Sequence, residues 1–168
     1  MSTADAIVIN NPFLTGNNEP VYEEITTTEL EVIGEVPADI SGSFLRTGPN
    51  PFYVPDEEKY HIFDGDGMIH GVSFKDGKAT YRNRFVQSKG LEEERTKGEW
   101  IYPGLNMLGE YIAKGEAPGV KNTGNTAMVF HQGQLYTMME GGTPYRISLP
   151  ELETEGEHDF DGTVTHNF

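Results

Sequence analysis

The chain has 168 residues, enough for one domain of ordinary size. Its net charge of −15 argues against non-specific binding of nucleic acid or anionic lipid, which needs an excess of lysine and arginine. The absence of cysteine excludes disulfides, thiolate nucleophiles and zinc sites built on cysteine. Because no apolar run reaches bilayer length and the start lacks the pattern of a secretion signal, we expect a cytoplasmic protein.

The first fifty residues predict an arm followed by short strands. Asparagine, proline and glycine indicate an irregular arm over 1–20, and weak alternation over 21–36 predicts one or two strands. Residues 36–42 indicate a turn with some helical character. Ser43–Arg46 is expected to form a short strand that ends in a tight loop over 48–51.

The clearest local unit is a β-hairpin over 68–86. Two runs typical of strands, Met68–Phe74 and Ala79–Val86, flank Asp76-Gly77, and this dipeptide is a strong hairpin signal. The second run places Tyr81 and Phe85 on one face and arginines on the other, as in an antiparallel strand with one solvated face.

The rest of the chain predicts a helical excursion and two more hairpins. Residues 91–121 have helical composition broken by proline and glycine, and we expect short helices there rather than a second domain. Strands then resume at 126–131 and 134–139 around Gln132-Gly133, and at 145–149 and 155–160. Successive hairpins predict a β-sandwich or a β-propeller, and two propeller blades with an excursion would fill the chain.

Generic catalytic motifs are absent from the sequence. A calcium-binding EF-hand loop that began at Asp64, in the DGDG run at 64–67, would need a carboxylate at its twelfth residue, which is Lys75. Five histidines occur, and a non-haem iron site needs several of them to converge on one metal. His61 and His70 flank the same turn, so convergence there is conceivable, but isolated structural histidines explain the pattern as well. The five are His61, His70, His131, His158 and His166.

An ordered series of segments resembles the carotenoid cleavage oxygenase family along nearly the whole chain. Each segment alone is weak, but together and in this order they identify the chain as similar to the N-terminal part of that family. One departure is Ile62, where the family often has tryptophan before the FDGDG motif. The segments are NPFL at 11–14, EPV at 19–21, FLRTGPNP at 44–51, FDGDGMIH at 63–70, KDGK at 75–78, YRNRF at 81–85, NTGNTA at 122–127, MEGGTPY at 139–145 and LETEG at 152–156.

The resemblance implies an all-β fold, the first blades of a seven-bladed β-propeller with a helical and loop excursion. It implies an iron(II) dioxygenase that uses O₂ to cleave a conjugated C=C bond of a lipophilic polyene or stilbene-like substrate into two carbonyl products. The family's first iron histidine follows the segment matched by 165–168. We therefore expect residues 1–168 to be part of one domain, with no iron ligand and no activity alone. Peripheral membrane contact would fall to parts of the protein that this sequence lacks.

The resemblance also assigns candidate site residues. Glu140 matches a glutamate that accepts a hydrogen bond from the free ring nitrogen of an iron histidine, and such a partner orients the ring. Thr126 lies fourteen positions earlier, as in members where this residue stands near the open iron position, although threonine also favours strands. Phe85, Trp100, Tyr102 and the 105–112 stretch could line the substrate tunnel or its cap, or could equally be core.

Two alternatives stay open. The same scaffold supports retinoid ester cleavage with isomerisation, but that branch tends to lack the Glu-Gly-Gly-x-Pro pattern seen at 140–144. The chain could instead be a catalytically inactive propeller fragment that acts only as a binding or interaction module. Whether the reading frame continues into an Ala-His-Pro segment distinguishes the enzyme from the module.

Overall fold

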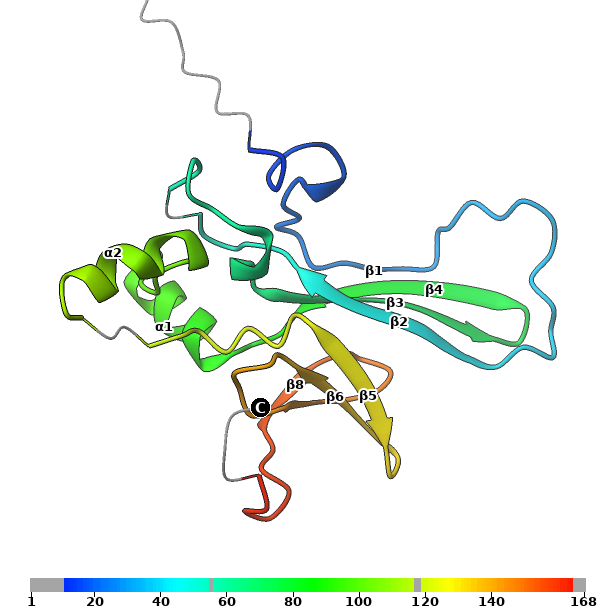
Figure 1. Ribbon diagram of the computed structural model, residues 1–168. Coiled ribbons are helices and arrows are strands. Elements are labelled where there is room, and N and C mark those ends of the chain that lie inside the picture. Colours follow the sequence, from blue (N-terminus) through cyan, green and yellow to red (C-terminus); the bar gives the residue numbers. More distant parts are fainter. Residues whose placement is uncertain (1–10, 55, 117–118, 165–168) are drawn as a thin grey trace, which may run out of the picture.

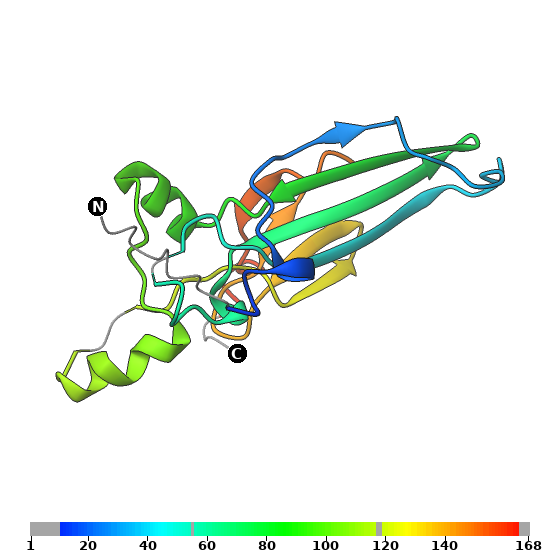
Figure 2. The ribbon, with the colours of Figure 1, turned by 90° about the horizontal axis from the view of Figure 1, so that it is seen from above.

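The computed structural model describes residues 11–54, 56–116 and 119–164. They form two four-stranded antiparallel sheets, and the helices gather at one end of both sheets (Figures 1 and 2). We call the sheet in the order β1-β4-β3-β2 sheet A, and the sheet in the order β5-β6-β7-β8 sheet B. The expected all-β fold of blade-like sheets with a helical excursion is confirmed.

Sheet A is built on the predicted hairpin. Its long strands are β3 (Gly67–Lys75) and β4 (Lys78–Phe85), which pair in register through a two-residue turn. Asp76 and Gly77 in that turn have φ of 51° and 72°, so both central residues occupy the left-handed region that favours Asp-Gly. The local turn chemistry thus fixes which side chains of sheet A face sheet B.

The flanking strands of sheet A differ from expectation. One strand forms within 21–36, where one or two were predicted, but this strand, β1 (Thr26–Thr27), has only two residues. Conversely, β2 (Gly42–Pro49) is twice as long as the predicted Ser43–Arg46 and includes part of the expected tight loop. Pro49 is tolerated because β2 is an edge strand, so its missing N–H removes no necessary ladder bond.

Sheet B contains the two later hairpins. The strands β5 (Ala127–His131) and β6 (Gln134–Met138) pair around Gln132 and Gly133, whose φ values of 49° and 78° match a second two-residue hairpin turn. The strands β7 (Tyr145–Ile147) and β8 (Thr154–Glu157) form the third hairpin. Both are shorter than predicted, because the pairing is irregular next to Ile147 and Phe160 lies in the turn after β8.

The principal core lies between the two sheets. Sheet A contributes Ile69 and the partly buried Leu45, and sheet B contributes residues such as Leu135 and Ile147. Leu152, from the turn between β7 and β8, completes this layer and approaches Gly71. The sheets are therefore stacked face to face through apolar side chains, as neighbouring blades require.

The excursion that connects β4 of sheet A to β5 of sheet B along the chain is helical, as predicted. The helix α1 (Lys89–Lys97) begins at Ser88, whose hydroxyl oxygen accepts from the Leu91 N–H at 3.1 Å, and ends at Gly98 with φ of 77°. A 3₁₀ turn, η3 (Leu105–Met107), leads into α2 (Leu108–Ala113). Two more 3₁₀ turns, η1 (Gly16–Asn18) and η2 (Ile62–Asp64), precede β3. Within the described residues, no helix has the length and apolar character needed to span a membrane.

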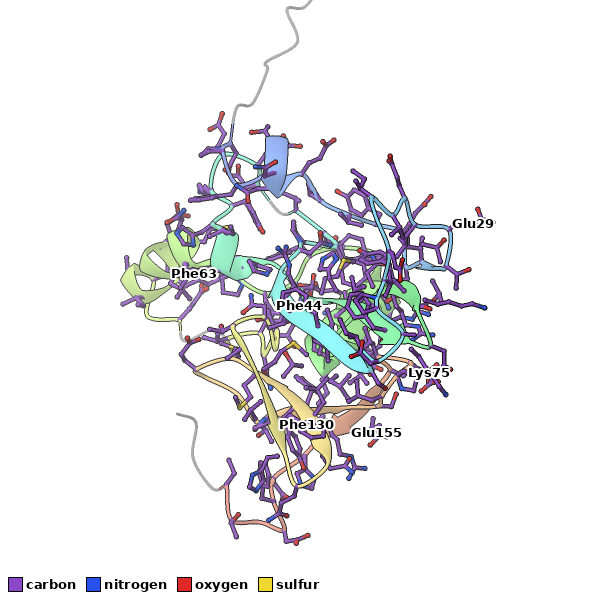
Figure 3. All side chains as sticks on the ribbon, turned by 90° about the vertical axis from the view of Figure 1, so that its right-hand side faces the viewer. Glu29, Phe44, Phe63, Lys75, Phe130 and Glu155 are labelled. Atoms are coloured by element: carbon purple, nitrogen blue, oxygen red, sulfur yellow. The ribbon has the colours of Figure 1, made fainter. Side chains whose placement is uncertain are left out.

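The face of sheet A that points away from sheet B carries a mixed surface. Phe44 projects from β2 and is 67% exposed (Figure 3). Beside it, the half-buried His70 makes a 2.8 Å hydrogen bond between its Nδ1 and the Tyr81 hydroxyl. Burial, followed by the positive charge of Arg46, lowers the pKa of His70 below its ordinary value. The fold therefore favours the neutral imidazole.

This preference predicts a pH dependence of stability. As pH falls below about 6.5, the unfolded chain takes up the His70 proton before the folded chain does, so the free energy of unfolding falls until the folded-state pKa is passed. We expect the urea midpoint to fall further between pH 7.5 and 5.5 in the wild type than in His70→Gln. The exposed His131→Gln serves as the matched control and should behave as the wild type. Equal losses in the wild type and His70→Gln would contradict the assignment.

Candidate active site

A cavity of about 280 Å³ lies where sheet A, the helical excursion and sheet B meet. Most of its lining surface is apolar, although half of the lining residues are polar, and several of these gather where the 121–126 segment approaches the end of β6. The apolar lining consists of Phe63, Trp100, Pro103, Leu105, Leu108, Val120 and Met139; the polar lining consists of Asp64, Tyr102, Lys121, Thr123, Asn125, Thr126 and Glu140. An apolar cavity with a few convergent polar groups is the usual form of a small-molecule site.

The structure brings four of the five sequence-predicted residues to this cavity, namely Trp100, Tyr102, Thr126 and Glu140. Leu105 and Leu108, from the 105–112 stretch, also line it. Phe85 does not. It is 1% exposed and packs with Met68 and Leu91 in a core cluster, with its ring centroid 5.4 Å from that of Phe52.

Thr126 and Glu140 are joined by a hydrogen bond. The Thr126 hydroxyl lies 3.1 Å from Glu140 Oε2 and 3.0 Å from Asn125 Oδ1, and its single proton can be donated to only one of them at a time. Both Thr126 and Glu140 are exposed, so the free carboxylate oxygen of Glu140 can accept from another group.

Buried Asn125 fixes the position of Thr126. Its amide nitrogen donates to the carbonyl oxygens of Gly65 at 2.7 Å and Phe63 at 3.1 Å. The Thr126 N–H donates to the Met138 carbonyl at 3.0 Å, which ties the same segment to the end of β6. The 122–127 motif thus anchors one polar side chain between two sheets.

Tyr102 is held by the excursion itself. Its hydroxyl donates to Glu93 Oε2 at 2.5 Å, and this bond, with burial as the next cause, raises the pKa of Tyr102 to about 12. The phenol therefore remains protonated at neutral pH and cannot serve as a general base. Its role in the cavity wall is that of a neutral, amphipathic side chain.

The carboxylates of the 64–67 loop are occupied by groups of this chain. Asp64 Oδ1 accepts from the Leu105 N–H at 2.8 Å, and Asp64 Oδ2 accepts from the His61 N–H at 3.0 Å. Asp66 Oδ2 accepts from the Phe52 N–H at 3.1 Å. Both residues therefore join neighbouring loops to the start of β3.

Across the described ranges, no three histidine or carboxylate side chains gather in a way that could hold a metal ion. The His61 Nδ1 accepts from the Phe63 N–H at 3.2 Å, and His70 bonds to Tyr81. His158 stacks on Tyr136, with ring centroids 5.3 Å apart. His131 is exposed at the end of β5, and His166 lies outside the described residues.

Sequence reasoning missed a buried ionic cluster behind the cavity. The Lys121 ammonium lies 2.5 Å from both Asp66 Oδ1 and Glu94 Oε2, and the three side chains are at most 4% exposed. Its members come from a loop, a helix and a connecting segment that are distant in sequence. No spacing pattern in the sequence predicts their contact.

Comparisons with known proteins identify the family of the chain. A family model described as retinal pigment epithelial membrane protein matches residues 18–168. A carotenoid 9,10(9′,10′)-cleavage dioxygenase 1 from Phaseolus vulgaris is 39% identical over 93% of the chain, and a carotenoid cleavage oxygenase from Mycobacterium tuberculosis is 39% identical over 98%. The chain belongs to the carotenoid oxygenase family.

Solved structures of carotenoid oxygenase family members share the fold. The lignostilbene dioxygenase of Pseudomonas brassicacearum superposes with a TM-score of 0.78 at 30% identity over 93% of this chain and 32% of that structure. Cobalt-substituted Synechocystis apocarotenoid oxygenase gives 0.76 at 30% identity over 88% of this chain and 32% of that structure. The chain also spans only 32% and 31% of the two sequence relatives.

Proposed function

We propose that this chain is the N-terminal part of an iron(II)-dependent dioxygenase that uses O₂ to cleave a conjugated C=C bond of a carotenoid, apocarotenoid or stilbene-like substrate into two carbonyl products. Residues 1–168 would form part of a single propeller domain. The observation that carries the proposal is the apolar cavity with the hydrogen-bonded Thr126–Glu140 pair at its polar end. The related carotenoid and lignostilbene dioxygenases support the choice of reaction.

The wall chemistry of the cavity supports a lipophilic substrate. Trp100, Leu108 and Val120 present apolar surface. Among the polar groups of the wall, Asp64, Tyr102 and Lys121 already bond to other groups of the chain. At about 280 Å³, the cavity accommodates a segment of a long polyene rather than the whole molecule. It would therefore form one section of a longer tunnel.

The exposure of Thr126 and Glu140 at this cavity supports the roles that we propose for them. Glu140 would accept a hydrogen bond from the free ring nitrogen of a metal-binding histidine and so hold the orientation of the ring. Thr126, fixed through Asn125, would border the position that O₂ or water approaches. The iron ligands in this proposal lie outside residues 1–168. Iron(II), when bound, supplies the activation of O₂.

The test compares this chain with a version extended through its downstream reading frame. We expect stoichiometric iron and O₂-dependent cleavage of an apocarotenoid or a hydroxystilbene only in the extended version. In that version, Glu140→Gln should lower the cleavage rate by about ten- to a hundredfold, because the ring of an iron ligand loses its anionic partner. Metal analysis and product chromatography provide the measurements.

Glu153→Gln is the matched control, because Glu153 is an exposed glutamate before β8 and does not line the cavity. Its rate should equal that of the unmodified extended version. Stoichiometric iron in the 168-residue chain would contradict the proposal and move the metal site to this chain's own histidines. An extended version with neither iron nor cleavage would favour a binding module.

A further inference from the structure

The Asp66–Lys121–Glu94 cluster joins the three parts of the fold. Asp66 immediately precedes β3 of sheet A, Glu94 lies on α1 of the excursion, and Lys121 lies on the segment that leads into sheet B. Each carboxylate approaches the ammonium at 2.5 Å, and each carboxylate side chain is fully buried. A displacement of any of these three parts would therefore change the distances within the cluster.

The charges in the cluster do not balance, since one ammonium faces two carboxyl groups. Burial raises the pKa of the Glu94 carboxyl, and the Lys121 ammonium acts against this shift. A buried ionic cluster of this kind is weak evidence for added stability, because well-packed neutral replacements are often equally stable. Its contacts between three segments that are distant in sequence are suited instead to fixing their relative positions.

Two contacts connect the cluster to the cavity wall. The Lys121 Nζ lies 5.0 Å from the ring centroid of Trp100, within cation–π range. Glu94 Oε1 accepts from the N–H of Ile101, the residue after Trp100, at 3.2 Å. Trp100 and Lys121 both line the cavity, so the cluster holds this part of the wall from behind.

We propose that the Asp66–Lys121–Glu94 cluster is a positioning device that holds Trp100 in place and thereby sets the width of the cavity for an extended apolar ligand. This inference rests on the proposed function for the nature of the ligand only. Lys121 acts through Trp100 and does not need to touch the reacting atoms. The cluster would then determine which chain cross-section the cavity accepts.

Trp100 is the only tryptophan in the chain, so its fluorescence reports the wall directly. The neutral variant Asp66→Asn/Glu94→Gln/Lys121→Met removes the charges at similar volume, and we expect it to melt cooperatively. We expect acrylamide to quench Trp100 more efficiently in this variant than in the wild type. An apocarotenoid aldehyde, titrated by its quenching of the same fluorescence, should bind about tenfold more weakly.

The matched control is Lys89→Met, the same substitution at a lysine on α1 whose side chain is 72% exposed and does not line the cavity. It should leave both readouts unchanged. Unchanged acrylamide quenching in the neutral variant would overturn the inference. Failure of the wild type to bind the aldehyde would instead contradict the proposed ligand class, and acrylamide quenching would still decide the positioning role.

Discussion

Lys121→Met alone is expected to lower the free energy of unfolding by about 3 to 5 kcal/mol, because it leaves Asp66 and Glu94 buried without their cation. Each carboxylate retains one backbone N–H donor, but neither donor supplies a full charge. Small domains are stable by about 5 to 15 kcal/mol, so this single change would remove a large part of the total.

Urea denaturation followed by circular dichroism measures this loss. The exposed Lys89→Met should change the free energy of unfolding by no more than about 0.5 kcal/mol. The neutral variant described above should recover most of the loss, because it removes the uncompensated charges together with the ammonium. A Lys121→Met chain as stable as the wild type would show that the carboxyl groups are neutral or hydrated in the fold.

Gly67→Ala is expected to destabilise the chain by about 3 kcal/mol or more, because an added Cβ would overlap backbone atoms. That Cβ would lie 2.5 Å from the Thr123 carbonyl oxygen and 2.8 Å from Val86 Cγ2. The Gly67 N–H also donates to the Thr123 oxygen at 3.0 Å, so these two segments of the chain cannot move apart without losing this bond. The site joins the first residue of β3 to the segment that carries Thr126.

Gly48→Ala is the matched control, since Gly48 lies in the neighbouring strand β2 and its Cβ would meet open space. Thermal unfolding of both variants should show a lowered midpoint for Gly67→Ala and little change for Gly48→Ala. Similar midpoints for the two variants would mean that the close approach of the segments is not required for stability.

The parts of the fold that could be predicted are those determined by neighbouring residues. Asp76-Gly77 and Gln132-Gly133 place two consecutive residues in the left-handed region, and this local requirement is visible in the sequence. The length of β2 depends instead on pairing with β3, which its own residues do not reveal. The cluster around Lys121 depends on three segments meeting in space, so no local pattern predicts it.

The candidate site shows the same limit. Thr126 and Glu140, which the resemblance singled out, lie at one cavity because they flank the hairpin of β5 and β6. The sequence could not decide whether Phe85 lies in the core or in the cavity wall. The alternation of side chains along a strand shows which face a residue is on, but not which element covers that face. The helix α1 covers that face through Leu91, and only the tertiary arrangement shows this.

The attachment of the N-terminal segment divides sheet A into parts of unequal local stability. β1 has two residues, and side chains of β4 hold the segment around it: the Asn83 amide pairs with the backbone of Glu23 and Ile25, and Arg84 donates to the Ile25 carbonyl. Few ladder bonds therefore protect this edge, whereas the β3–β4 hairpin is paired along its full length. Local opening would begin at the edge, and amide protons there would exchange with solvent well before those of the hairpin.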